Sequence, residues 1–156
     1  MTNFAVYINP GFTNKQSIFE LLINLQKEHR VLHPQQKKLN FFGDAEQQDI
    51  LLEPVKLVDF VGTSPVPKID CILVFGGDGT ILRAKDLALK TSAPILGINL
   101  GYLGFLSEST LPEIRASIRD LIAGKFKILS RMLILCSVKR SGALILQREA
   151  LNDAVI

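Results

Sequence analysis

The sequence predicts an α/β protein whose first part, residues 1 to about 125, forms an open and mostly parallel sheet with flanking helices. The apolar run CILVF at 71–75 is typical of a strand buried on both faces, as in a parallel sheet. A helical pattern over 80–90 and an apolar run over 93–98 follow it and complete a strand-helix-strand unit. From about residue 126 the pattern changes to that of antiparallel strands, so we expect residues 126–156 to begin a β-rich domain.

The elements before this unit are predicted from short local signals. The β-prone run FAVYI at 4–8 ends at the turn sequence Asn9-Pro10-Gly11. Thr13 and Gln16 have the spacing of a capping box, which predicts a helix of three or four turns. Residues 34–68 mix Gln, Lys and Pro with short apolar stretches, and there we expect one short element and a mobile loop. The apolar face of the helix recurs at Ile18, Leu22 and Leu25.

A loop and a further helix are predicted after the strand-helix-strand unit. Glycines recur through 99–106, which indicates a loop. Thr110 and Glu113 have the spacing of a second capping box before a helical pattern, and Gly124 ends that helix. The apolar face of this helix is formed by Ile114, Ile118, Leu121 and Ile122.

The last part of the chain has the pattern of a β-hairpin. Two apolar runs, 132–138 and 143–146, flank the turn sequence Lys139-Arg140-Ser141-Gly142. The sequence stops at Ile156 within a further apolar run, and a hairpin alone is marginally stable in water. We therefore expect a fragment of a longer protein, or a chain that needs a partner to cover its open strand edge.

Composition and charge disfavour several classes of protein. With 156 residues, 47% hydrophobic and 21% charged, the chain is an ordinary globular protein. The net charge of +3 comes from scattered residues, so no nucleic-acid partner is expected. A signal peptide and an apolar run of about 18 residues are both absent from the sequence, so we expect a soluble protein without a membrane partner. Cys71 and Cys136 form no metal-binding or disulfide pattern, which favours a cytoplasmic protein.

The segment Gly76-Gly77-Asp78-Gly79-Thr80 is the main candidate for chemistry. It follows the buried strand and opens a helix, and open parallel sheets bind ligands at such positions. Glycines let phosphate oxygens approach backbone N–H groups, and a helix N-terminus attracts anions. Asp78 would repel an anion there unless it accepts the proton of an attacking hydroxyl or reaches a Mg²⁺ held by phosphates. Both roles belong to phosphoryl transfer.

A purely structural interpretation of this segment stays open at this point. Asp78 could be the N-cap of the helix, accepting the N–H of Thr80 or Ile81, while the glycines serve the turn. The common nucleotide-binding motifs are missing, because the sequence has no GxxxxGK[ST] and Leu82 stands where GxGxxG needs glycine. A P-loop ATPase and a hydride-transferring Rossmann enzyme are therefore disfavoured.

Three blocks of the sequence, taken in order, resemble the NAD kinases. They are GGDGT at 76–80, GINLGYLGFL at 97–106 and Asn152-Asp153. Enzymes of this family phosphorylate the 2′-hydroxyl of the adenosine ribose of NAD, with ATP or polyphosphate, to give NADP. The first block is shared with diacylglycerol, sphingosine and phosphofructokinase-type kinases, whereas the second distinguishes the NAD kinases.

The resemblance implies a role for individual residues. Asp78 would be the general base that takes the proton of the ribose hydroxyl. Phe105 would pack near the adenine, although a core position also suits a phenylalanine. Arg83 could reach phosphate, although a solvent-facing arginine is the simpler interpretation. The other candidates for binding NAD or nucleotide are Gly77, Gly79, Thr80, Asn99, Asn152 and Asp153.

The resemblance also implies cofactors and partners. Mg²⁺ or another divalent cation would act with ATP, held mainly by phosphates, with Asp78 as the candidate protein ligand. NAD kinases are nearly twice as long, add a large β-rich domain and form dimers or tetramers. We therefore expect a truncated, poorly active part of a homodimer or homotetramer. Two alternatives remain, namely a lipid kinase of the diacylglycerol type and a non-catalytic nucleotide-binding fragment.

Overall fold

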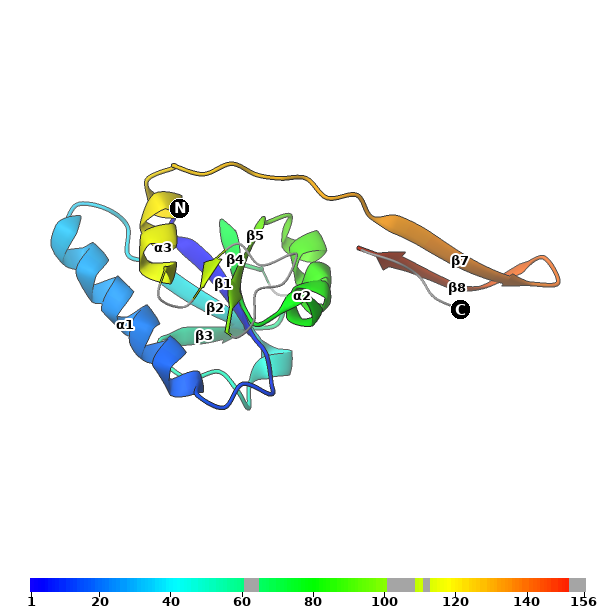
Figure 1. Cartoon of the computed structure of the whole chain (residues 1–156), viewed down its shortest axis with the longest axis horizontal. Helices are drawn as coiled ribbons and strands as arrows, with labels where there is room; N and C mark the ends of the chain where they lie inside the picture. The colour runs from blue at the N-terminus through cyan, green and yellow to red at the C-terminus, as the bar shows by residue number, and fades with distance from the viewer. Residues whose placement is uncertain (61–64, 101–108, 111–112, 152–156) are drawn as a thin grey trace. The chain divides into compact units, whose positions relative to one another are not determined.

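The computed structural model describes residues 1–60, 65–100, 109–110 and 113–151. The chain folds into two compact units, Met1–Phe126 and Lys127–Ile156 (Figure 1). The first unit holds a six-stranded parallel sheet with helices on both faces, and the second holds a two-stranded antiparallel sheet. These features confirm the predicted fold class.

The sheet of the first unit has the order β3-β2-β1-β4-β5-β6, and each neighbouring pair of strands is parallel. The chain begins in the middle of the sheet, builds one half outward, and returns to build the other half. β1 and β4 therefore meet at a topological switch point, where ligands of such sheets bind. The strands are β1 (Asn3–Ile8), β2 (Asn40–Asp44), β3 (Val55–Val58), β4 (Cys71–Phe75), β5 (Ile95–Asn99) and β6 (Ser109–Thr110).

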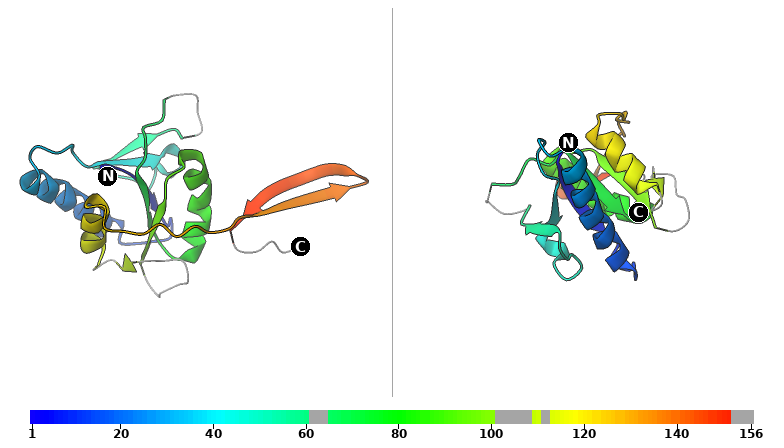
Figure 2. Two further views of the ribbon diagram at one scale, coloured as in Figure 1. Left: turned by 90° about the horizontal axis from the view of Figure 1, so that it is seen from above. Right: turned by 90° about the vertical axis from the view of Figure 1, so that its left-hand side faces the viewer.

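Helices cover both faces of this sheet (Figure 2). α1 (Lys15–Leu32) and α3 (Ile114–Ile122) pack on the face that receives Phe4, Val6 and Ile8 of β1. α2 (Asp78–Thr91) packs on the other face, which receives Ala5. The connections that leave β1 and β4 thus diverge to opposite faces, as a switch point requires. In the described part of the chain, no helix is long and apolar enough to cross a membrane.

The central strand has the burial that its sequence predicts. All five residues of β4 are buried, which agrees with a strand covered on both faces. Burial raises the pKa of the Cys71 thiol in this strand to about 12. A thiol with so high a pKa is almost entirely protonated near neutral pH, so Cys71 acts as a core residue.

The first helix differs from its prediction at both ends. α1 has 18 residues, which is about five turns rather than three or four. The predicted capping box at Thr13 is wrong, because Asn14 is the N-cap and no side chain caps the helix there. The Ser17 hydroxyl instead donates to the Asn14 carbonyl at 2.8 Å. The helix is longer than predicted because it continues into a last turn with exposed residues outside the apolar pattern. The predicted apolar positions Ile18, Leu22 and Leu25 are buried.

The second predicted capping box is also wrong. Thr110 lies in β6, where it pairs with Asn99 of β5, so it belongs to the sheet rather than to a helix end. α3 begins at Ile114, after an N-cap residue, Glu113, that makes no side-chain capping bond. The predicted end is correct, since Gly124 has a φ of 72° just past the helix.

Residues 34–68 contain more regular structure than one short element and a loop. They form β2, β3 and a 3₁₀ helix, Ala45–Gln47. β2 is short, and Gly43 interrupts its apolar pattern. The Leu51 side chain lies where a Cβ of Gly43 would stand, so this glycine marks a close approach within a strand rather than its end.

The second unit is a β-hairpin, as the sequence predicts. β7 (Ile134–Arg140) and β8 (Ala143–Ala150) pair antiparallel. Ser141 and Gly142 connect them with φ values of 49° and 83°, and a two-residue type I′ turn requires such positive values. The hairpin exposes large apolar side chains, namely Ile134, Leu135, Val138, Leu144, Ile145 and Leu146.

Candidate active site at the end of β4

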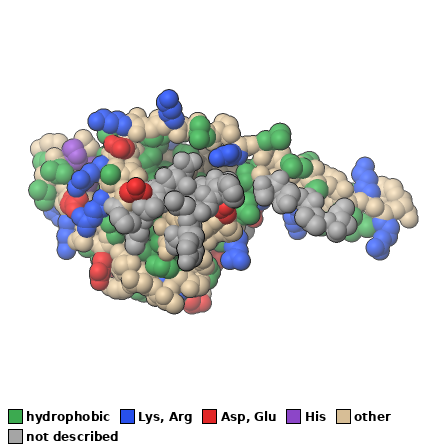
Figure 3. Space-filling model, viewed as in Figure 1, with side chains coloured by type: hydrophobic (Ala, Val, Ile, Leu, Met, Phe, Trp, Pro, Cys, Tyr) green, Lys and Arg blue, Asp and Glu red, His purple; other side chains and the backbone are tan. Residues whose placement is uncertain are grey.

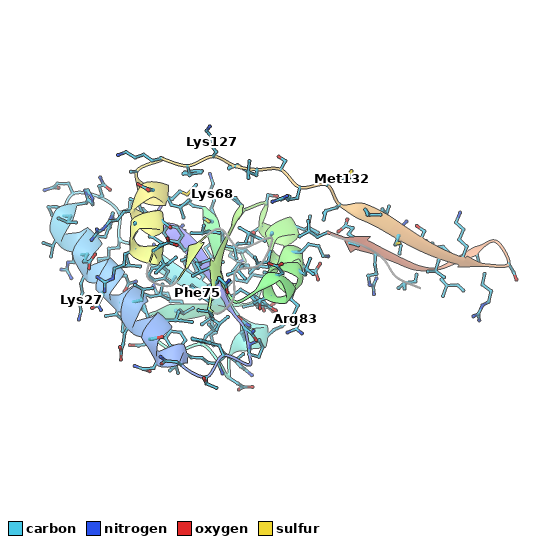
Figure 4. All side chains as sticks on the ribbon, viewed as in Figure 1. Lys27, Lys68, Phe75, Arg83, Lys127 and Met132 are labelled. Atoms are coloured by element: carbon cyan, nitrogen blue, oxygen red, sulfur yellow. The ribbon has the colours of Figure 1, made fainter. Side chains whose placement is uncertain are left out.

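The glycine-rich segment lies at the carboxyl end of β4. The N–H of Gly76 donates to the Ile98 carbonyl of β5 at 2.9 Å. On the other side, the N–H of Asn9, just after β1, donates to the Phe75 carbonyl at 2.8 Å. Backbone bonds to both neighbouring strands therefore fix the point at which the segment begins. Phe75 and Arg83 lie toward the edge of the sheet that the carboxyl ends of the strands form, and Lys68 lies toward the opposite edge (Figure 4).

The segment runs directly into α2. Gly77 is the N-cap, with an extended backbone, and its carbonyl accepts the N–H groups of Thr80 at 2.8 Å and Ile81 at 3.2 Å. Asp78 is therefore the first residue of the helix, and the interpretation of this aspartate as the N-cap is wrong. A carboxylate in the first turn lies at the positive end of the helix dipole.

The three glycines of the segment have different surroundings. A Cβ on Gly76 would overlap the Thr80 side chain, so packing requires glycine there. At Gly77 and Gly79, no atom of the described residues lies within 4 Å of the place that a Cβ would take, apart from the adjoining residues and the helix backbone, and neither glycine has a positive φ. Neither packing nor backbone conformation accounts for these two glycines. The space beside them borders the start of α2, where the helix dipole favours negative charge.

Three further predicted residues lie around this segment. The Thr80 side chain is buried against Gly76. Arg83 is exposed one turn further along α2. Asn99 is buried at the end of β5, beside β4. The structure therefore brings all three to the same edge of the sheet as Asp78, with Thr80 beneath the turn rather than facing outward.

The positive charge of Arg83 acts on the Tyr7 side chain of β1. Burial raises the pKa of the Tyr7 phenol, and the Arg83 guanidinium works in the opposite direction. Asp44 at the end of β2, Glu46 in the 3₁₀ helix that follows and Asp86 of α2 raise this pKa further. The Arg83 charge therefore acts on the β1 side of α2, near the ends of β1 and β2.

The remaining predicted site residues lie outside the described part of the chain. They are Phe105, Asn152 and Asp153. Their roles stay predictions.

Two polar residues at this edge were missed by the sequence analysis. Gln47 is buried, and its side-chain amide makes two hydrogen bonds with the Ile8 backbone. Asn9 holds a tight turn, since its Oδ1 accepts the Gly11 N–H at 2.9 Å and its carbonyl accepts the Phe12 N–H at 3.0 Å. The Asn-Pro-Gly sequence does signal a turn, whereas a single glutamine in a polar segment carries no signal.

The candidate site suits a divalent cation that binds together with a phosphate ligand. No group of three or more His, Cys, Asp or Glu residues that could hold a metal ion occurs among the described residues. Mg²⁺ usually needs only one or two carboxylates when phosphates and water complete its shell. Asp78, next to the open space at the start of α2, offers one such carboxylate.

Charged side chains elsewhere form local pairs. Glu28 of α1 accepts from Arg115 at 2.6 Å and from Arg119 at 2.9 Å, which links α1 to α3. On the face shown in Figure 3, Lys and Arg lie in several places, with acidic and apolar side chains between them. Charge alone therefore does not mark the site on this face, and the geometry of the glycine-rich segment does.

A cavity of about 140 Å³ lies at the opposite edge of the sheet. The end of α1, the segment before β2 and the end of α3 form its walls, and lining residues include Leu25, His29, Leu39, Arg119 and Ile122. None of the predicted site residues in the described part of the chain lines it. This cavity is therefore separate from the candidate site.

Comparisons with known proteins found similar sequences over much of the chain. A family model described as the ATP-NAD kinase N-terminal domain matches residues 7–126. The NAD kinase of Desulforamulus reducens is 46% identical over 87 residues, which cover 56% of this chain and 30% of that protein. The NAD kinase of Leifsonia xyli subsp. xyli is 33% identical over 117 residues, which cover 73% of this chain and 38% of that protein.

A solved structure shares the fold. Yeast NADH kinase, crystallised with NADH, superposes with a TM-score of 0.66 at 20% identity. The match covers 97% of this chain and 47% of the yeast chain. The chain thus spans 30% and 38% of the length of the two curated relatives and 47% of the yeast chain.

Proposed function

The chain belongs to the family of ATP-NAD kinase N-terminal domains, and from this premise we propose that it takes part in phosphorylating NAD. The reaction transfers a phosphoryl group from ATP or polyphosphate to the 2′-hydroxyl of the adenosine ribose, giving NADP. One observation carries the proposal. Asp78 stands in the first turn of α2 between two glycines, 77 and 79, that have open space beside them and no packing reason to be glycine.

The open space suits the phosphates of the donor. Backbone N–H groups at the start of α2 and the helix dipole favour negative charge there. A Cβ at either glycine would stand between those groups and a phosphate oxygen. Fixed backbone donors also need little reorganisation as charge develops during transfer, which is why such sites lower barriers.

Asp78 serves as the general base. Its carboxylate accepts the proton of the ribose hydroxyl while the bond from that oxygen to phosphorus forms. A carboxylate oxygen can accept a proton, and Asp78 places one in the first turn of α2. Positioning accounts for the rest of the catalysis, because a phosphoryl transfer requires the donor and acceptor oxygens to be in line.

A divalent cation, when bound with the donor, neutralises negative charge on the phosphates. Asp78 is the described residue that would hold it, and phosphate oxygens and water would supply the other ligands. Arg83 adds a positive charge one turn away, on the β1 side of α2.

In the first unit, Asn99 at the end of β5 is the described candidate for holding the acceptor. We place Asn99, Phe105, Asn152 and Asp153 against NAD, and Thr80 beneath the phosphate turn. Residues 1–125 form the catalytic domain, and 126–156 belong to a β-rich domain. A homodimer or homotetramer completes the pocket.

The proposal is tested by turnover of the full-length protein with NAD, ATP and Mg²⁺. NADP is measured with an NADP-specific dehydrogenase, and diacylglycerol is offered in a parallel reaction with the same donor. Formation of NADP without phosphatidate supports the proposal. Phosphorylation of the lipid alone, or of neither acceptor, contradicts it.

A further inference from the structure

The end of β1 has an unusual hydrogen-bond partner. Pairing between β1 and β2 ends at Val6 and Gly43, because β2 then turns into the 3₁₀ helix Ala45–Gln47. The Gln47 side chain continues the pairing in place of a strand. Its Nε2 donates to the Ile8 carbonyl at 2.7 Å, and its Oε1 accepts the Ile8 N–H at 3.1 Å. Both bonds are buried, so water cannot take the place of the missing strand partner at Ile8. The Gln47 side chain supplies the two bonds that a neighbouring backbone would otherwise make.

These bonds act directly on the turn that follows β1. Asn9 comes next in the chain, and its N–H is bonded to Phe75 at the end of β4. The turn from Asn9 to Phe12 is therefore held on one side by Gln47, through Ile8, and on the other by β4. Gly76 and Gly77 follow Phe75, so this turn and the glycine-rich segment begin on neighbouring strands at the switch point.

We propose that Gln47 is a positioning residue for the phosphoryl donor, because it holds the turn from Asn9 to Phe12 as a wall of the donor's site. This inference rests on the proposed function. Asn99, which we assign to NAD, ends β5 on one side of β4, whereas this turn follows β1 on the other side. In-line transfer places donor and acceptor on opposite sides of the transferred group, which leaves the β1 side for the donor.

The position of Arg83 agrees with this assignment. Its charge acts on Tyr7 of β1, so a cation lies on the side given to the donor. Asp44 fixes the same region from β2, because its Oδ1 accepts the Glu46 N–H at 3.0 Å and so starts the turn that carries Gln47.

The variant Gln47→Glu tests the role through pH. A neutral carboxyl group has one O–H donor and one acceptor, so it can reproduce both bonds to Ile8, whereas a carboxylate can only accept. Burial and the nearby carboxylates of Asp44 and Glu46 favour the neutral form, and Arg83 favours the ionised form. Gln47→Met has a similar size and makes neither bond at any pH.

Steady-state kinetics of the full-length protein with Mg-ATP and NAD give the result. For Gln47→Glu, we compare the KM for the donor with that of the wild type at each pH. We expect this ratio to rise about fivefold or more from pH 6 to pH 8.5. The KM for NAD should stay within about twofold of the wild type. For Gln47→Met, we expect a raised donor KM at both pH values. Unchanged donor KM in both variants, or a raised NAD KM alone, overturns the inference even if their melting temperatures fall.

A measurement on the wild type covers variants that fail to fold. A non-hydrolysable ATP analogue with Mg²⁺ is titrated while backbone amide resonances are followed by NMR. We expect larger shifts for Gly11 and Phe12 than for residues 95–98 of β5, and the absence of such shifts overturns the inference. A wild-type protein that makes no NADP defeats the proposed function, whereas an active wild type with kinetically silent Gln47 variants defeats only the role of Gln47.

Discussion

The Thr80 side chain fills the space that a Cβ on Gly76 would need. The two residues lie one helical turn apart at the start of α2, and Thr80 is buried. The Gly76 N–H is also bonded to Ile98, so the backbone has little freedom to move away. This contact sets the angle at which the chain leaves β4 and enters the helix that carries Asp78.

Replacing Gly76 with alanine should therefore destabilise the fold. The added methyl group overlaps three atoms of the Thr80 side chain. Overpacking of this kind costs about 1–3 kcal/mol of the free energy of unfolding, measured by urea denaturation. Gly77→Ala is the matched control, because its neighbourhood is open, and it should cost less than about 1 kcal/mol, the usual difference between glycine and alanine at an N-cap. Equal stability of the Gly76 and Gly77 variants would show that the contact is unimportant.

Replacing Gly79 with alanine should separate stability from activity. Alanine is favoured over glycine inside a helix by up to about 1 kcal/mol, and no described atom lies near the new methyl group. We expect an unchanged or higher urea midpoint. The methyl group would stand in the space assigned to phosphate, so kcat/KM for the donor should fall about tenfold or more. Full activity in this variant would mean that phosphate does not approach Gly79.

Asp70 should make stability depend on acid pH. Burial tends to raise the pKa of this carboxyl, but the N–H groups of Thr2 and Asn3, together with the positive charges of the N-terminus and Lys68, lower the pKa below its ordinary value. A pKa lowered by folding stabilises the protein above the unfolded value, and this contribution is lost as pH falls through the folded value. Asp70→Asn should lower the urea midpoint at pH 7, and the difference from the wild type should shrink below about pH 4. A pH-independent difference would contradict this role.

Much of the sheet could be predicted because its signals are local. CILVF at 71–75 is apolar at each position, and it forms the strand that is covered on both faces. β2 gave no comparable signal. Gly43 and Asp44 break its pattern, and the reasons for both residues, contact with Leu51 and capping of Glu46, exist only in the folded chain.

The two capping-box predictions failed for a similar reason. The spacing of Thr13 and Gln16 is compatible with a cap, but the turn held by Asn9 delays the start of α1 to Lys15. Thr110 is drawn into the sheet by pairing with Asn99. At Thr110, tertiary pairing prevailed over a local preference.

The candidate site, like the fold, was predictable only in part. Asp78 and its glycines were predictable from a contiguous motif whose position at the end of a buried strand has a physical meaning. Gln47 was not, because its role depends on where β1 and β2 stop pairing. The sequence also does not show that Thr80 points into the fold rather than outward.

The most direct test of the account is the turnover number of Asp78→Asn in the full-length protein, with NAD, ATP and Mg²⁺. Asparagine keeps the size of the side chain but cannot accept the ribose proton. We predict that kcat falls about a hundredfold or more, while the urea midpoint stays close to that of the wild type. A kcat within about threefold of the wild type would contradict the assignment of Asp78 as the general base.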